Sequence, residues 1–278
     1  MPVAHYENFP VASWLLPARF RPPIEAIYAF ARGADDIADE GDLADAERLA
    51  GLGRYLAALD AIERGETPAV PPFAAIAMAI RRYHLPVALL RDLIDAFRQD
   101  VSCKRYRDFE RLLDYCRRSA NPVGRLLLHL FGMTDARSLR ESDAICTSLQ
   151  LINFWQDVEA DFAKGRIYIP QSDLERFGVS ERDIAERRAD DRWQRLLAFE
   201  CERARALLLS GTPLGKRLPG RLGLEIRATV QGGARILDRI EAARGDVFRH
   251  RPVLGPMDWI VILARALMKA GVRPQTEP

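Results

Sequence analysis

The sequence predicts an all-α fold, and three observations point to it. Helix-forming residues dominate the chain of 278 residues, and apolar residues recur in it at helical spacing. No alternation of apolar and polar residues, the pattern typical of strands, runs for more than a few positions. Glycine and proline gather between the periodic stretches, where they end helices. With 48% hydrophobic residues, the chain can bury a sizeable core.

The helices follow one another with short interruptions. The clearest loops are "RGETPAVPP" at 64–72 and "SGTPLGKRLPG" at 210–220, both rich in helix breakers. Apolar helical patterns resume at once on both sides of each loop, so we expect a single domain over residues 1–278. The expected helices cover residues 22–40, 42–64, 72–84, 86–101, 108–118, 121–131, 137–163, 180–187, 189–210, 219–243 and 256–270.

Composition excludes several classes of protein. Lys and Arg number 41 against 39 Asp and Glu, so the basic surface of a nucleic-acid binder is not expected. The four cysteines and four histidines are scattered without zinc-site spacing. The N-terminal stretch lacks the pattern of a signal peptide, and the apolar runs are too short to span a bilayer. We expect a cytoplasmic protein, with contact to the inner membrane surface left open.

The helix expected at 137–163 carries charge beside bulky apolar residues. At 100° per residue, Gln150, Asn153, Asp157 and Asp161 fall within one arc of roughly 80°, next to an arc of aromatic and aliphatic residues. Carboxylates at spacing i,i+4 repel each other, and Mg²⁺ would offset that repulsion. The alternative is a solvated face on which Asp161 pairs with Lys164 or an arginine.

A second acidic stretch, "IYAFARGADDIADE", lies about 120 residues earlier. An apolar stripe from Ile27 to Ala38 leaves Arg32, Asp35, Asp36 and Asp39 on another arc of the same helix. Such residues often face solvent, and this alternative stays open. Two facing helices that both offer carboxylates could, however, hold Mg²⁺ ions around a diphosphate, where they act as a Lewis acid on C–O ionisation.

These stretches resemble a known family over nearly the whole chain. The matching segments are "LLP" (15–17), "AIYAFARGADDIADE" (26–40), "YC" and "VG" (115–124), "QLINFWQDVEADFAKGRIYIP" (150–170), and "ILDRI" with "DVF" (236–248). In this order they resemble the squalene and phytoene synthase family. The resemblance implies an isoprenoid-synthase fold with a central cavity between both acidic helices, several Mg²⁺ ions, and long prenyl diphosphate substrates.

The chain departs from the family pattern near the expected diphosphate site. The Ser-rich segment that helps hold diphosphate reads "NFPVAS", with Asn8 and Pro10 at the serine positions, and "QDVEAD" places Gln156 and Ala160 where arginine and glutamate are usual. "SANPVG" and a small residue near Gly233 are further departures. They weigh against condensation of two farnesyl diphosphates, and the chain looks more similar to the hydroxysqualene synthases of bacterial hopanoid pathways.

The resemblance also implies roles for individual residues. The reaction implied starts from presqualene diphosphate, ends in capture of a carbocation by water, and needs no NADPH. Aromatic residues such as Phe9, Tyr28 and Trp155 could shield the cation, although most aromatics at helical spacing are core. The implied sets are the Mg²⁺ ligands Asp35, Asp36, Asp39, Asp157 and Asp161, the diphosphate-binding Arg32, Arg166 and Tyr168, and the water-positioning Tyr115, Asn121 and Asn153.

Alternatives remain for these residues and for the function. Tyr115 could be a packed helix tyrosine, and Asn121 an N-cap before Pro122. Arg249 and Arg251 could reach phosphate or simply be solvated. The chain could be a prenyltransferase that makes presqualene diphosphate, squalene or phytoene, or a non-catalytic assembly partner. As partners we expect a presqualene diphosphate synthase that supplies the substrate and an oxidoreductase that takes the product.

Overall fold

The structure, a computed structural model, describes residues 17–249, 251–269 and 271–272. Within these ranges the chain is helical, apart from a single β-bridge between Arg105 and Ile167. The all-α prediction is therefore confirmed. The elements are η1 (Ala18–Phe20), α1 (Arg21–Asp39), α2 (Asp45–Glu63), α3 (Phe73–Tyr83), α4 (Val87–Ser102), α5 (Phe109–Ser119), α6 (Asn121–Leu130), α7 (Ala136–Gln156), α8 (Val158–Ala163), α9 (Gln171–Phe177), α10 (Glu181–Ala185), α11 (Asp191–Gly211), α12 (Leu214–Arg217), α13 (Gly220–Ala242) and α14 (Pro256–Leu267).

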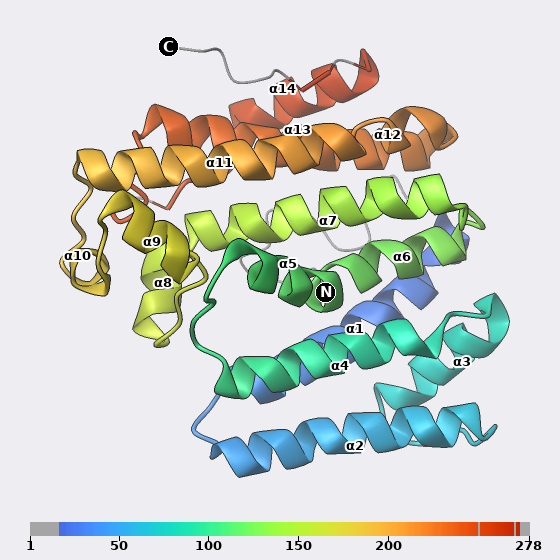
Figure 1. The fold of residues 1–278 in the computed structure, drawn as a ribbon. Coiled ribbons are helices and arrows are strands. Elements are labelled where there is room, and N and C mark those ends of the chain that lie inside the picture. Colours follow the sequence, from blue (N-terminus) through green and yellow to red (C-terminus); the bar gives the residue numbers. More distant parts are fainter. Residues whose placement is uncertain (1–16, 250, 270, 273–278) are drawn as a thin grey trace.

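The long helices are stacked in successive layers (Figure 1). Helix α2 packs on α4, α7 packs on α11, and α14 lies against α13 at the outer edge of the molecule. Two large apolar clusters form the core, one built mainly by α1–α4 and the other mainly by α5, α7, α11 and α13. Helices α6 and α4 contribute to both clusters. The two acidic helices α1 and α7 face a common space, since residues of both line the same cavities.

Close packing of α7 against α11 depends on a glycine. A Cβ on Gly211 would lie 2.5 Å from the Ile145 side chain and 2.6 Å from the backbone oxygen of Glu141. Because a real Cβ does not approach other atoms so closely, only glycine allows the two backbones to meet here. This contact fixes α7, and with it the second acidic stretch, against the body of the molecule.

The structure corrects three of the predicted elements. The helix expected at 137–163 is broken at Asp157, which leaves helical geometry with φ −104° and ψ 14°, so that α7 and α8 are separate. The loop expected at 210–220 contains α12, which is too short to show periodicity. Helix α9 was not predicted. Its first turn is held by hydrogen bonds from the backbone N–H groups of Gln171 and Ser172 to the distant backbone oxygens of Tyr106 and Arg107.

No helix in the described ranges is long and apolar enough to cross a membrane.

Candidate active site

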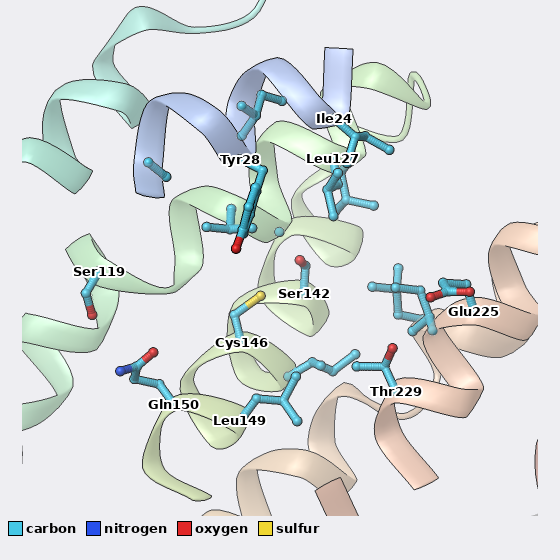
Figure 2. A pocket seen from close by; sticks show the side chains of 18 of the residues that line it. Ile24, Tyr28, Ser119, Leu127, Ser142, Cys146, Leu149, Gln150, Glu225 and Thr229 are labelled. Carbon is cyan, nitrogen blue, oxygen red and sulfur yellow. The ribbon is translucent and has the colours of Figure 1, made fainter. Parts of the chain in front are cut away.

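Two adjoining chambers lie between the acidic helices. The larger one, of about 610 Å³, has mostly apolar walls from α1, α4–α7, α12 and α13, and we call it the apolar chamber. Figure 2 shows side chains from three sides of it, such as Tyr28 on α1, Cys146 on α7 and Thr229 on α13. Its volume lies in the range of pockets that enclose whole ligands.

The smaller chamber, of about 180 Å³, is walled by charged groups, and we call it the polar chamber. It adjoins the apolar chamber at residues that line both. These junction residues are Asp35, Tyr115, Gln150 and Asn153. The other residues that line the polar chamber are Asp39, Asp100, Phe154, Asp157, Asp161, Arg166 and Tyr168.

Most of the predicted site residues therefore meet in one place, although Asp35 and Tyr168 are 133 residues apart in the chain. Arg32 lines the apolar chamber beside the junction. Within the described ranges, Asp36 and Asn121 line neither chamber. The sequence indicates Gln150 only as part of the polar arc and does not indicate Asp100 as a site residue.

Arg166 is the buried cation of the polar chamber. Its guanidinium donates two hydrogen bonds to the Asp39 carboxylate, at 2.8 and 2.5 Å, and a third to the backbone oxygen of Asp100 at 3.2 Å. Burial would raise the pKa of Asp39, but the hydrogen bonds and charge of Arg166 hold it below its ordinary value. The pair fixes the C-terminal end of α1 against the segment that follows α8.

Asp35 lies at the junction, in an environment that favours its ionised form less than that of Asp39 does. Arg32 contacts it at 3.2 Å and also pairs with Asp36 at 2.7 Å, so one guanidinium is shared by two carboxylates. Burial, followed by repulsion from Asp39, raises the pKa of Asp35 to about 6. A cation added to the polar chamber would relieve this repulsion.

The carboxylates on the opposite wall are Asp157 and Asp161. Arg251 donates from Nη2 to Asp157 Oδ2 at 3.0 Å and from Nε to the other carboxylate oxygen. Burial, followed by repulsion from Asp157, raises the pKa of Asp161 to about 7. The alternative of a solvated face does not describe Asp161, which lines the chamber with Asp157, although Arg166 and Lys164 both lower its pKa.

The donor set fits Mg²⁺ in chemistry, since hard carboxylate oxygens from two walls face one small space. As the side chains stand, no three acidic, histidine or cysteine groups of the described residues lie close enough together to hold a metal ion. Mg²⁺ is commonly bound by one or two carboxylates together with substrate phosphates, without a full protein cage. The polar chamber has the composition that such shared binding needs.

Asp100 is the site residue that sequence reasoning missed. It is only 4% exposed, and the Tyr115 hydroxyl donates a hydrogen bond of 2.7 Å to its Oδ2. Its Oδ1 has no hydrogen-bond partner among the described residues. Burial raises the pKa of Asp100 to about 7 although the Tyr115 hydrogen bond lowers it. The available signal was a carboxylate on the stripe of α4 that otherwise carries buried apolar residues such as Leu93 and Phe97.

Aromatic rings close the side of the polar chamber. Tyr168 stacks on Phe154 with ring centroids 3.7 Å apart and an interplanar angle of 6°. Tyr115 lies 6.0 Å from the Tyr168 ring and is buried. Tyr115 is therefore both packed, as one alternative held, and in contact with the chamber, as the other required. Trp155 is fully buried in the core and lines neither chamber, so it is not placed to shield a cation.

Asn121 occupies a different position from the one expected. It is the first residue of α6, whose N-cap is Ala120, so the N-cap interpretation is wrong. Its side-chain oxygen accepts a hydrogen bond of 2.8 Å from the Thr147 hydroxyl, which ties α6 to α7. The structure therefore gives Asn121 a buried structural contact outside the lining of both chambers.

The structure shows where the residues that depart from the family pattern lie. The Gln156 amide donates to the backbone oxygen of Pro252 at 2.6 Å, and Gln156 does not line either chamber. Arg251, close to Pro252, instead brings a guanidinium to Asp157. Arg249 is 83% exposed and pairs with Asp246. Asn8, Phe9 and Pro10 lie outside the described residues.

Comparison with known proteins agrees with this geometry. Residues 3–258 match the profile of the squalene/phytoene synthase family. The chain is 35% identical to a hydroxysqualene synthase of Rhodopseudomonas palustris over 96% of its own length and 90% of the relative. It is 36% identical to a phytoene synthase of Mycobacterium tuberculosis over 71% of its own length and 65% of the relative.

Solved structures of similar proteins share the fold. The crystal structure of squalene synthase HpnC from Alicyclobacillus acidocaldarius matches with a TM-score of 0.80 and 42% identity, covering 86% of this chain and 90% of that one. A dehydrosqualene synthase matches in fold with a TM-score of 0.82 at 23% identity, covering 91% of this chain and 88% of that one. The expected isoprenoid-synthase fold is thereby confirmed.

Proposed function

The chain belongs to the squalene/phytoene synthase family, and from that premise we propose that it converts presqualene diphosphate and water into hydroxysqualene and diphosphate. The C–O bond to diphosphate breaks, the cyclopropylcarbinyl cation rearranges, and water adds to the cation and releases a proton. No electrons are gained or lost in this balance, so NADPH is not required. This is the activity of a carbon–oxygen lyase, and its product serves squalene and hopanoid biosynthesis.

The observation that carries the proposal is the joining of a carboxylate-walled polar chamber to a large apolar chamber. A prenyl diphosphate has the same division, with a charged head and a long hydrocarbon. We place the diphosphate in the polar chamber and the hydrocarbon in the apolar chamber. The reacting carbon then lies at the junction, beside Tyr115, Gln150 and Asn153.

The polar side chains at this junction support water capture. Tyr115 and Asn153 belong to the set expected to position water, and Gln150 adds an amide at the same place. The Tyr115 hydroxyl is fixed by Asp100, so its oxygen keeps lone pairs that can accept a hydrogen bond from water. Away from the junction the wall is mainly aliphatic and aromatic, which protects a carbocation from other nucleophiles.

Diphosphate binding would use two arginines that pair with carboxylates in the structure. The proposed carboxylate ligands of Mg²⁺, which when bound would neutralise the leaving diphosphate, are Asp35, Asp39, Asp157 and Asp161 of the polar chamber. Asp36, outside the lining, stays in the proposed set and would have to turn toward the chamber to take part. Arg32, Arg166 and Tyr168 are proposed to bind its oxygens, since arginine forms charge-assisted hydrogen bonds with phosphate. Each of these arginines now pairs with a carboxylate, and binding exchanges those partners for phosphate.

The second candidate is head-to-head prenyl transfer from two farnesyl diphosphates. The similarity to a phytoene synthase favours it, and two apolar chains need a chamber of similar character. The third candidate, a non-catalytic assembly partner, is disfavoured because carboxylates from both acidic stretches line one chamber. Supply of substrate by a presqualene diphosphate synthase and transfer of product to an oxidoreductase remain part of the proposal.

Product analysis of the purified protein distinguishes the candidates. The protein is incubated with Mg²⁺ and either farnesyl or presqualene diphosphate, with and without NADPH, in water labelled with oxygen-18. We expect consumption of presqualene diphosphate alone and a labelled alcohol that forms without NADPH. Condensation of farnesyl diphosphate would support prenyl transfer instead, and no turnover of either substrate would support the non-catalytic candidate.

Asn153→Leu and Asn121→Leu form a matched pair for the same assay. Both remove an amide, but only Asn153 stands at the junction. We expect Asn153→Leu to divert the cation from the labelled alcohol to hydrocarbon products. In Asn121→Leu the remaining turnover should keep the parent ratio of products, because the lost contact is the one to Thr147.

A further inference from the structure

The outward face of α14 is apolar along its whole length. Met257, Ile260, Leu267 and Met268 are 71%, 60%, 64% and 72% exposed, and Val261 and Leu263 lie between them on the same face. Among the described residues, seven of the twelve large apolar side chains with high exposure fall between Val253 and Met268. The others are scattered singly, which is usual on protein surfaces.

The inward face of the same helix packs against α13. Ile262 and Ala266 are buried against Ala228 of α13. Asp258 is 1% exposed and accepts hydrogen bonds from Arg235 and Arg239. The outward apolar face is thus presented by a well-anchored helix. A helix that is apolar on both faces normally meets a second apolar medium.

The size of the face argues against a second copy of this chain as that medium. A helix of 12 residues is about 18 Å long and roughly 10 Å wide, so its footprint is roughly 200 Å². Stable protein interfaces bury about 800 Å² on each partner. The same length is too short to span the roughly 30 Å of a bilayer core.

The charge around the face indicates what it meets. Arg235 and Arg239 of α13 are 39% and 42% exposed while they pair with Asp258, and Lys269 follows the helix on the exposed side. An apolar helix face with cations beside it is the surface that binds the interface of an anionic bilayer.

We propose that α14 docks the protein on an anionic lipid membrane, with its outward apolar side chains in the interfacial region and the neighbouring cations at the lipid headgroups. The family match ends at residue 258, so most of this face lies beyond the matched region. The proposal stands on the surface itself and does not depend on which reaction the chambers catalyse.

Vesicle co-sedimentation tests this docking. The purified full chain is mixed with vesicles of phosphatidylcholine alone or with about one third phosphatidylglycerol. We expect binding to the anionic vesicles that weakens as salt is added. The double variant Ile260→Gln/Leu267→Gln should lose at least about tenfold in apparent affinity, because both side chains leave the bilayer. Met78→Gln, at an isolated apolar residue that is 63% exposed on α3, is the matched control and should bind like the parent.

Three results of the vesicle assay would overturn the proposal: no binding of the parent to anionic vesicles, equal loss in the Met78→Gln control, or unchanged binding of the double variant. Sedimentation in solution is measured alongside, and a dimer that the double variant dissociates would also refute it. Turnover in detergent separates docking from catalysis, since the double variant should keep the turnover of the parent there whether or not the proposed reaction is correct.

Discussion

Replacing Asp161 by asparagine should stabilise the metal-free protein above neutral pH. In the folded chain, burial and the charge of Asp157 raise the pKa of Asp161 to about 7, while the unfolded chain keeps the ordinary value of 3.8. Below both values the two states are protonated alike. As pH rises from 3.8 to about 7, the unfolded state releases its proton first, and stability falls until the folded carboxyl also ionises.

The magnitude follows from the size of this shift. A change from 3.8 to about 7 corresponds to about 4 kcal/mol, at roughly 1.4 kcal/mol for each pH unit. Asp161 is only partly buried, and solvent that reaches it screens part of the repulsion. We therefore expect Asp161→Asn to raise the free energy of unfolding by about 2 kcal/mol near pH 8, and by little near pH 4.

Denaturant unfolding of parent and variant at both pH values, without divalent cations, measures the effect. Asp95→Asn is the control, because Asp95 is 54% exposed on α4, and its unfolding free energy should change by less than about 0.5 kcal/mol. Adding Mg²⁺ with diphosphate should stabilise the parent more than Asp161→Asn. If the variant gains nothing near pH 8, or gains equally at both pH values, the argument from carboxylate repulsion is wrong.

Three further changes test other parts of the site. Tyr115→Phe removes the hydrogen bond to buried Asp100 and should lower the free energy of unfolding by about 1–3 kcal/mol near pH 8, and by less near pH 5, where Asp100 is protonated; denaturant titration at both pH values measures this. In Arg166→Lys the ammonium cannot form the bidentate hydrogen bonds that the guanidinium makes with Asp39 and would make with phosphate. Steady-state kinetics should therefore show a KM for the diphosphate substrate that is raised about tenfold. Gly211→Ala overpacks the contact of α7 with α11 and should cost about 1–3 kcal/mol of stability in thermal unfolding.

Local periodicity was sufficient for most of the fold. Helices α1, α11 and α13 are long and amphipathic or bounded by breakers, so their existence and approximate ends can be predicted from the sequence, as can the start of α7. Helices α9 and α12 have too few turns to show a period. The break at Asp157 was not predictable, because Asp157 is contacted by Arg251, which lies 94 residues later in the chain.

The carboxylates of the polar chamber were predictable because two acidic stretches share an unusual pattern. Their arginine partners were only partly predictable. Arg32 pairs within its own helix, whereas Arg166 reaches Asp39 across 127 residues and Arg251 reaches Asp157 across 94. Such contacts depend on how the helices pack, and the spacing of residues within one helix does not predict that packing. Asp100 differs, since its place on the apolar stripe of α4 was a local signal, and only its partner Tyr115, on the next helix, depends on packing.

The polar chamber contains groups that lower the stability of the protein without a ligand. Two of its carboxyl groups, Asp35 and Asp161, have their pKa raised by burial and by a neighbouring carboxylate, and buried Asp100 has an oxygen without a hydrogen-bond partner among the described residues. A fold optimised only for stability would avoid such groups or pair each of them. Because local rules fail together at functional sites, this concentration of repulsion next to an apolar chamber is itself an argument for a ligand that supplies positive charge there. The same repulsion that lowers stability without a ligand would then strengthen binding of Mg²⁺ with diphosphate, since binding removes it.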